Sequence, residues 1–300
     1  MRLLSSDDKL LSSTPDTLSK LQEKHPGPHR NTSWPLPPEN PDPMICTRDD
    51  IKNAIKSFRN GAGAGPDGLR PGHLKQLTAD ILGPAAISLL DALVDFVNNI
   101  ALEGNVPQVM VPIFYGAGLI ALSKPDNGVR PIAVGLTLRR KVVTGKLKDK
   151  CSELLHPHQL GVALPREAEI GTHSLRQYVH HNHTNDKLVA KIDFKNAFNT
   201  IRRDVVLTIV KERVPALFKM TKQSYSTPSY LYFGDKDILE SREGVQQGDP
   251  LGSFLFSLGI MDLMKSCESE LSIWYLDDGT VAGDPSVVHR DLTKILSSSI

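Results

Sequence analysis

The feature that most constrains this chain is the stretch SIWYLDDGTVAG at residues 272–283. Apolar residues on both sides of Asp277 and Asp278 predict two short strands joined by a tight turn at or next to Asp278-Gly279. Two adjacent carboxylates repel each other, and burying both costs free energy unless their charge is compensated. The pair therefore indicates either a solvated hairpin tip or a bound cation, and this stretch alone leaves both readings open.

A second predicted strand, LVAKIDF at 188–194, also ends beside an acid, Asp193. Leu188, Ala190 and Ile192 alternate along one face of this strand, so Asp193 falls on the other face. If this strand and the Asp277-Asp278 strand are neighbours, three carboxylates converge, which is unfavourable unless cations compensate them. Mg²⁺ prefers oxygen ligands, and a pair of ions can clamp the attacking and leaving oxygens of a phosphoryl transfer. The pattern therefore predicts a metal-dependent phosphoryl-transfer site.

The rest of the chain reads as alternating helices and short strands. Periodicity predicts helices at 48–59, 81–102, 136–155, 168–181, 197–213, 251–266 and from 286 onward. Strands are predicted on both sides of the turn PDNG within 118–134, and at 229–233 and 237–241. Residues 61–74 are rich in glycine, but they lack the GxxxxGK[ST] pattern and a preceding strand, so we read them as a turn-rich connector.

Residues 1–45 hold eight of the 21 prolines and few large apolar side chains, which predicts a disordered or extended tail. The apolar stretch 81–102 contains Asp91 and Asp95, so we expect an amphipathic core helix and no membrane span. The three cysteines are scattered, and no signal peptide is recognisable. These features predict an intracellular protein, nuclear or cytoplasmic, with reduced thiols.

Formal net charge is only +1, but the charge is unevenly distributed. Residues 121–150 carry eight Lys and Arg against two acids, whereas residues 235–300 carry twelve acids against five Lys and Arg. This asymmetry suggests a polyanion-binding surface beside a metal-binding one. Chance clustering on a solvated face is the alternative.

Four stretches, taken in order, resemble the reverse transcriptase domain of non-LTR retrotransposons. They are LSKPDNGVRPIAV (122–134), KIDFKNAFNTI (191–201), GVQQGDPLG (244–252) and WYLDDG (274–279). The resemblance implies an α+β polymerase right-hand fold: a palm with a small antiparallel sheet backed by helices, plus a fingers subdomain. We accordingly expect fingers at 46–187 and palm at 188–300, after the N-terminal tail at 1–45.

The resemblance also implies roles for individual residues around the acids. Asp193, Asp277 and Asp278 match the catalytic aspartates that hold two Mg²⁺ ions, for which Mn²⁺ could substitute. The backbone carbonyl of Phe194 matches a further metal ligand. Phe198, five positions after Asp193, matches an aromatic gate that excludes the 2′-hydroxyl and so favours deoxynucleotides over ribonucleotides.

Other matched residues would contact the substrates. Lys124 and Arg130 match residues that grip the incoming triphosphate, where positive charge stabilises the phosphates. Gln247 and Gly248 match the loop beside the nucleotide and the template base. The basic helix would lie near the template–primer and contact its backbone without reading sequence; its candidate residues are Arg139, Arg140, Lys141 and Lys146.

The predicted function is RNA-directed DNA polymerase, with an RNA template, a DNA primer and dNTP as partners. Two departures from the family stand out. Gly252-Ser253-Phe254-Leu255 replaces the usual Gly-Pro-Leu-Leu, and the chain ends 22 residues after Asp278, which leaves no room for a thumb. We therefore expect fingers and palm only; a thumb or other domains encoded by the element could act with this chain in trans. The alternative is a truncated retroelement relic that binds nucleic acid but lacks activity alone; an RNA-making polymerase is disfavoured by Phe198.

Overall fold

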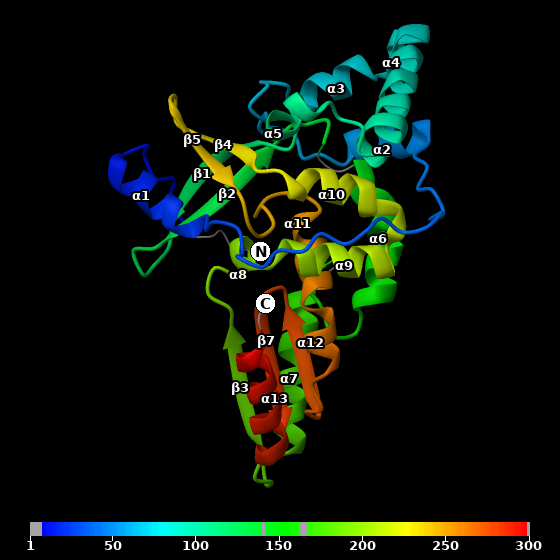
Figure 1. Cartoon of the computed structure of the whole chain (residues 1–300). Helices are drawn as coiled ribbons and strands as arrows, with labels where there is room; N and C mark the ends of the chain where they lie inside the picture. Colours follow the sequence, from blue (N-terminus) through cyan, green and yellow to red (C-terminus); the bar gives the residue numbers. More distant parts are fainter. Residues whose placement is uncertain (1–7, 140–141, 163–166, 299–300) are drawn as a thin grey trace.

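The computed structural model describes residues 8–139, 142–162 and 167–298. The described chain is a mixed α/β protein with two separate sheets, one in the upper and one in the lower half of Figure 1. Helices pack between and around these sheets. The predicted mixture of helices and short strands is confirmed, and it is the relation between the two sheets that positions the candidate site.

The upper sheet has four strands in the order β2-β1-β4-β5. Its strands are β1 (Ala117–Ser123), β2 (Val129–Gly135), β4 (Ser229–Phe233) and β5 (Asp237–Ser241). The hairpins β1–β2 and β4–β5 are antiparallel, and β1 joins β4 in parallel. Residues 229–241 therefore lie with the first hairpin, although the sequence-based boundary assigns them to the other subdomain.

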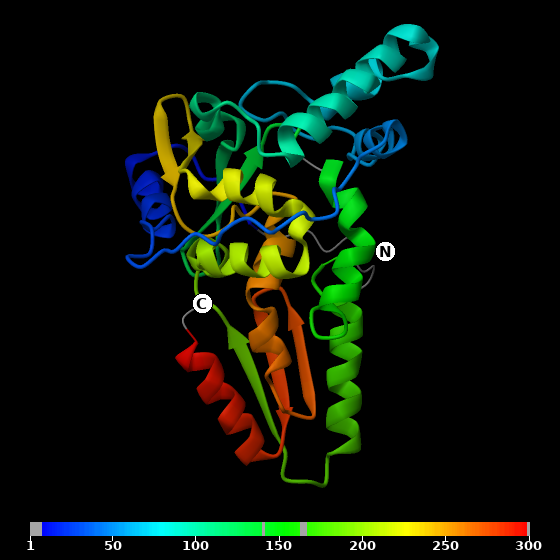
Figure 2. The ribbon, with the colours of Figure 1, turned by 45° about the vertical axis from the view of Figure 1, so that its right-hand side comes forward.

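The lower sheet has three antiparallel strands in the order β3-β7-β6. They are β3 (Leu188–Asp193), β6 (Leu271–Tyr275) and β7 (Asp278–Gly283). Helix α13 (Pro285–Ser297) packs against β3 and β7, while α7 (Glu167–His181) contacts β6. Figure 2 shows this narrow sheet between the two helices. All three strands fall at the predicted positions, because alternation and turn residues are local signals.

The remaining helices pack between the sheets or over the upper half. They are α2 (Arg48–Lys56), α3 (Pro71–Leu77), η1 (Asp80–Leu82), α4 (Pro84–Asp95), η2 (Phe96–Leu102), η3 (Gln108–Met110), α5 (Val111–Phe114), α6 (Val142–Leu155), α8 (Ala197–Thr200), α9 (Arg203–Arg213), η4 (Pro215–Leu217), α10 (Phe218–Ser226), α11 (Gly252–Gly259) and α12 (Met261–Lys265). The predicted helix 197–213 is divided in two, and the basic helix begins at Val142 instead of residue 136.

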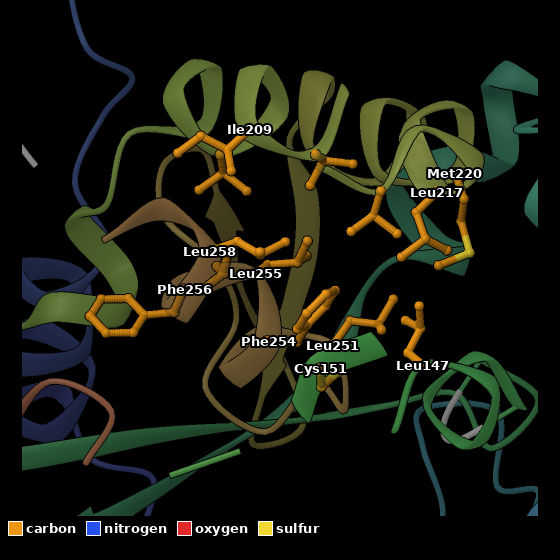
Figure 3. Close-up of a cluster of buried hydrophobic side chains, with 14 of the residues drawn as sticks. Leu147, Cys151, Ile209, Leu217, Met220, Leu251, Phe254, Leu255, Phe256 and Leu258 are labelled. Atoms are coloured by element: carbon orange, nitrogen blue, oxygen red, sulfur yellow. The ribbon is translucent and has the colours of Figure 1, made fainter. Parts of the chain in front are cut away.

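The largest core joins α6, α9, α10 and α11. Figure 3 shows Leu147 and Cys151 of α6 close to Leu251 and Phe254 at the start of α11, with α9 and α10 above them in this view. Phe254, one of the two residues that depart from the usual motif, is 2% exposed within this cluster. It fills the core as an ordinary large apolar side chain, and burying such a ring contributes about 1.5–3 kcal/mol.

The N-terminal segment is more ordered than predicted. Helix α1 (Pro15–Lys24) begins after Thr14, whose side chain accepts the Thr17 amide, and Pro15 stands at its first position. Leu21 is fully buried against the upper sheet. The residues that flank α1 are rich in proline, as the composition indicated. The helix itself forms because Thr14 caps its first turn and because packing of Leu21 stabilises it.

The prediction of a core helix at 81–102 is correct only for one face. Leu90 and Val97 are buried, yet Ile87 is 47% exposed, and the helix projects from the body in Figure 2. Among the described residues, Pro84–Leu102 is the one helix that is long and apolar enough to span a membrane. This differs from the expectation that its acids make it too polar. Core helices of soluble proteins also meet this criterion of length and hydropathy. Asp91 pairs with Arg48 of α2.

Candidate active site

Asp193 and Asp278 face each other across adjacent strands. In the antiparallel register of β3 and β7, Asp193 is directly opposite Asp278, and Tyr275 of β6 is opposite Asp278 on its other side. Both carboxyl-bearing residues are exposed, as expected at the open end of the sheet. The predicted pairing of the strands that carry Asp193 and Asp278 is therefore present in the fold.

Asp277 completes the group from the turn between β6 and β7. Burial raises the pKa of the Asp277 carboxyl above its usual value, and the negative charges of Asp278 and Asp193 raise it further. The positive charge of Lys124 acts in the opposite direction on the same pKa. Asp277 therefore interacts electrostatically with both other acids, and a cation would reduce this repulsion.

The donor set suits a hard divalent cation in chemistry. Carboxylate oxygens are the side-chain ligands that Mg²⁺ prefers, and Mg²⁺ commonly uses only one or two carboxylates together with water and substrate phosphates. Within the described ranges, no three His, Cys, Asp or Glu side chains are placed so that they could hold one ion. In the part of the chain that the structure describes, the acids therefore do not form a closed cage, and an ion there would need further ligands from water or a substrate.

Lys124 reaches the acids from the other sheet. It begins the turn of the β1–β2 hairpin, where its N–H donates to the carbonyl of Gly128 at 2.9 Å and Asn127 adopts a positive φ of 59°. Its charge is close enough to Asp277 to influence that carboxyl. The hairpin that bears two predicted triphosphate contacts therefore points a cation toward the catalytic candidates.

Arg130, the other predicted triphosphate contact, is already engaged. Its Nη1 donates to Oδ2 of Asp8 in the N-terminal segment. That segment runs along β1, where Leu11 N–H donates to Ala121 O at 2.9 Å and Ser123 N–H donates to Lys9 O at 2.8 Å. An acid of the chain itself therefore occupies the guanidinium that we expected to face a phosphate.

The loop between β5 and α11 contacts β2 of the upper sheet. The N–H of Ala133 in β2 donates to Gln247 O at 2.7 Å. Gly248 has φ +110°, and a Cβ there would lie 2.5 Å from Ala133 O, so this close approach requires glycine. Gln247 is half-buried and Gly248 is exposed. The predicted loop residues are thus held at the junction of the β1–β2 hairpin and the helices.

Phe198 is mostly buried in the core. It is 8% exposed and stacks on Phe256 with ring centroids 4.6 Å apart. Its backbone carbonyl accepts the N–H of Val245 at 2.7 Å, which ties it to the same loop as Gln247. The structure therefore shows the packing role directly, and any contact with a sugar would come through the small exposed part of the ring.

Arg139 differs from its predicted role as a nucleic-acid contact. Its Nη2 pairs with Asp249 at 2.8 Å, and their side chains are 8% and 9% exposed. The guanidinium also donates to Tyr115 O and to Gln246 Oε1. Its charge is neutralised inside the protein, so Arg139 is not carried into the candidate nucleic-acid surface. Arg140 and Lys141 lie outside the described residues, as does the side chain of Lys146.

Two contacts around the acids were not predicted from the sequence. Phe194, the expected backbone ligand, stacks its ring on Trp274 at 5.9 Å, which fixes the chain directly after Asp193. Gln159 is 1% exposed, and its amide binds the backbone of Leu276 in the acid-bearing turn. The sequence carries no spacing signal for Gln159, because this contact depends on a partner 117 positions away.

Comparisons with known proteins show the family to which the chain belongs. The reverse transcriptase (RNA-dependent DNA polymerase) family matches residues 122–300, which is more than half of the chain. The chain therefore belongs to the reverse transcriptase family, as its motifs predicted. The match includes Lys124 and all three candidate aspartates.

Individual relatives are more distant. The chain is 26% identical over 267 residues to the retrotransposable element SLACS 132 kDa protein of Trypanosoma brucei gambiense; the alignment covers 84% of this chain and 22% of that protein. Among solved structures, telomerase from Candida albicans, in complex with a fragment of telomeric RNA, is similar over 61% of this chain and 40% of its own, with a TM-score of 0.46 and 12% identity. An apo telomerase from Candida tropicalis, truncated from its C-terminal domain, has a TM-score of 0.45 and 14% identity over 70% of this chain and 52% of its own. At these scores the telomerase structures carry no argument about activity.

Proposed function

We propose that this chain is the RNA-directed DNA polymerase domain of a retroelement, and that it adds a dNTP to a primer 3′-hydroxyl on an RNA template. The observation that carries the proposal is the placement of Asp193 opposite Asp278, with Asp277 between the strands and Lys124 beside it. In this proposal a polyphosphate and its metal ions would bind between the acids of one sheet and the cation carried by the other.

In this proposal the lower sheet with α13 is the palm, and the β1–β2 hairpin belongs to the fingers. Residues 46–187 and 188–300 are the proposed subdomains, except that β4 and β5 extend the upper sheet. Asp193 and Asp277 would hold the divalent ions, Asp278 would be the less direct ligand, and the Phe194 carbonyl would add an oxygen. When bound, Mg²⁺ or Mn²⁺ would lower the pKa of the primer hydroxyl and offset charge on the phosphates.

The other residues would bind and orient the substrates. Lys124 would hold the triphosphate, and Arg130 would do so once released from Asp8. Gln247 and Gly248 would border the nucleotide and the template base, while the exposed part of Phe198 would limit the sugar.

The test is extension of a DNA primer by one nucleotide on an RNA template, with Mg²⁺ and excess protein to offset weak binding. We expect extension by the unmodified chain, none after addition of EDTA, and a loss of about 10³-fold or more in Asp277→Asn. Asp235→Asn is the matched control, because Asp235 is an exposed acid in the β4–β5 turn.

A folded chain that binds the RNA–DNA hybrid but never extends the primer would support the relic instead. Folding is checked by a cooperative thermal transition, and hybrid binding by fluorescence anisotropy. Extension that is equal in Asp277→Asn and in the unmodified chain would refute the metal-binding role of Asp277.

A further inference from the structure

The turn that carries the candidate catalytic acids contains a strained residue. Leu276 has a positive φ of 56°, in the left-handed region that non-glycine residues seldom adopt. Such a conformation is energetically unfavourable and persists only where the surrounding structure holds it. Leu276 stands between Tyr275 and Asp277, so whatever holds it also sets the direction in which Asp277 leaves the turn.

One buried amide binds both backbone groups of Leu276. The N–H of Leu276 donates to Oε1 of Gln159 at 2.6 Å, and Nε2 of Gln159 donates to the carbonyl of Leu276 at 3.2 Å. Oε1 also accepts the N–H of Gly161 at 3.0 Å. Gln159 is 1% exposed, so water does not compete for these bonds.

The backbone around Gln159 is fitted to the same turn. Leu160 N–H donates to Trp274 O at 2.7 Å, and Trp274 N–H donates to His158 O at 2.8 Å, so residues 158–160 run beside β6 as a short parallel addition. A Cβ on Gly161 would lie 2.8 Å from Leu276 N and 2.7 Å from its Cγ. The close contact with Leu276 therefore depends on glycine at position 161, independently of the glutamine.

We propose that Gln159 is a positioning residue for the polymerase reaction: with Gly161, it holds Leu276 in its strained conformation and so aims Asp277 and Asp278. The inference rests on the proposed polymerase function, because it assigns a role within that site. Gln159 would act through Leu276 and would not contact nucleotide or metal. If the amide served stability alone, its loss would lower the melting temperature and leave the kinetics of the folded enzyme unchanged.

The first test compares single-nucleotide extension by Gln159→Met with that of the unmodified chain. Met is close to Gln in size but can neither donate to nor accept from Leu276 as an amide does. We expect kcat to fall about 10- to 100-fold, while the dNTP KM and the hybrid Kd change by less than about twofold, because the acids are misaligned but the binding surfaces remain. A folded Gln159→Met with unchanged kcat would overturn the inference.

Gln159→Glu provides a conservative variant with a pH signature. As a carboxylate it still accepts from Leu276 N–H and Gly161 N–H, but it cannot donate to the Leu276 carbonyl; when protonated, it can. The ratio of its kcat to that of the unmodified chain should therefore rise as pH falls. A ratio that stays flat across pH would contradict the requirement for a donor to Leu276 O.

Thr78→Val is the matched control for loss of a buried hydrogen bond. Thr78, the C-cap residue of α3, is 5% exposed, and its hydroxyl donates to Leu74 O at 2.7 Å. This variant should lower stability without changing kcat. A similar fall in kcat for Thr78→Val would show that general destabilisation explains the effect of Gln159→Met.

Amide hydrogen exchange tests positioning without any enzymatic activity. The Leu276 amide should exchange at least about tenfold faster in Gln159→Met, while the core amides of α9 exchange as before. Unchanged Leu276 exchange would overturn the inference. If the unmodified chain extends no primer, the proposed function fails, yet the exchange experiment still decides whether Gln159 holds the turn.

Discussion

Asp193 lies directly opposite Asp278 in the register of β3 and β7, and Asp277 directly precedes Asp278 in the turn. Like charges directly opposite each other on a sheet destabilise it, so this arrangement works against folding in the absence of a cation. The cost is concentrated at Asp277, where burial and the two neighbouring acids raise the pKa of the carboxyl. Carboxyls with a pKa shifted in this way are frequent at functional sites, which makes Asp277 a candidate for one.

Asp277→Asn should raise the melting temperature in EDTA at neutral pH, by about 1–3 °C. The pKa of Asp277 is higher in the folded state than its usual value of 3.8, so the folded state binds this proton more tightly than the unfolded state. The free energy of unfolding therefore falls as pH rises from 3.8, the usual pKa, to the raised pKa of the folded state. Above the raised pKa the destabilisation by the Asp277 charge is complete. Thermal melts at several pH values should show the gain of Asp277→Asn shrinking toward pH 4.

Mg²⁺ provides the second half of this test. It should raise the melting temperature of the unmodified chain, because a ligand that binds only the folded state stabilises it, and it should do so much less in Asp277→Asn. Asp235→Asn should behave as the unmodified chain in both buffers. A lower melting temperature for Asp277→Asn in EDTA would contradict the argument from repulsion.

Much of this fold could be predicted from the sequence because its signals are local. The hairpin at residues 117–135 is marked by alternating apolar residues around Asp126-Asn127-Gly128, and the structure places strands on both sides of that turn. Convergence of Asp193 with Asp278 was predictable only on condition that their strands pair, since 84 or more residues separate them.

The remaining features depend on tertiary partners that a sequence does not name. Arg139 reads as a surface cation within a basic run, but Asp249 lies 110 positions away and neutralises it inside the protein. Asp8 meets Arg130 across 122 positions, and the amide of Gln159 finds Leu276 across 117. Buried polar and charged groups are expected to have hydrogen-bond or ion-pair partners, but only the fold shows which residues these partners are.

Arg139→Met tests the buried ion pair. Removing one partner of a buried pair leaves an unpaired charge and costs about 3–5 kcal/mol, so the melting temperature should fall steeply. The double variant Arg139→Met/Asp249→Asn should recover part of the loss, because Asn keeps an acceptor for the Tyr225 hydroxyl without the charge. Thermal melts of both variants and of Asp249→Asn complete the cycle.

The salt dependence of hybrid binding separates this role from the one predicted by the sequence. Loss of one phosphate contact would reduce the slope of log K against log salt by about 0.9. We expect the slope of Arg139→Met/Asp249→Asn to equal that of the unmodified chain. If the slope of log K against log salt were reduced in this variant while its melting temperature stayed normal, Arg139 would be a nucleic-acid contact after all.

Phe198→Leu should relax selection against ribonucleotides. A smaller side chain leaves room at the sugar, and the ratio of kcat/KM for dNTP to that for rNTP should fall about tenfold or more. Phe256→Leu is the control, because it removes the other ring of the same stack and disturbs the core similarly. Equal loss of selectivity in both variants, or none in Phe198→Leu, would assign Phe198 to packing alone.

Asp8→Asn should lower the KM for dNTP by about 1.5- to 5-fold, with kcat unchanged. In the folded chain Asp8 binds the Arg130 guanidinium, so a triphosphate must displace this carboxylate before it can use the same donors. Exposed pairs contribute about 0.2–1 kcal/mol, and Arg130 is 38% exposed in its side chain, which sets the expected size of the effect.

The measurement is single-nucleotide extension over a dNTP titration, at low and at high salt. The difference between Asp8→Asn and the unmodified chain should shrink at high salt, because the ion pair is then screened. Asp16→Asn, which removes an acid paired with Lys20 on α1, should leave the KM unchanged. A KM that rises in Asp8→Asn would mean that Asp8 holds Arg130 ready for the nucleotide instead of competing with it.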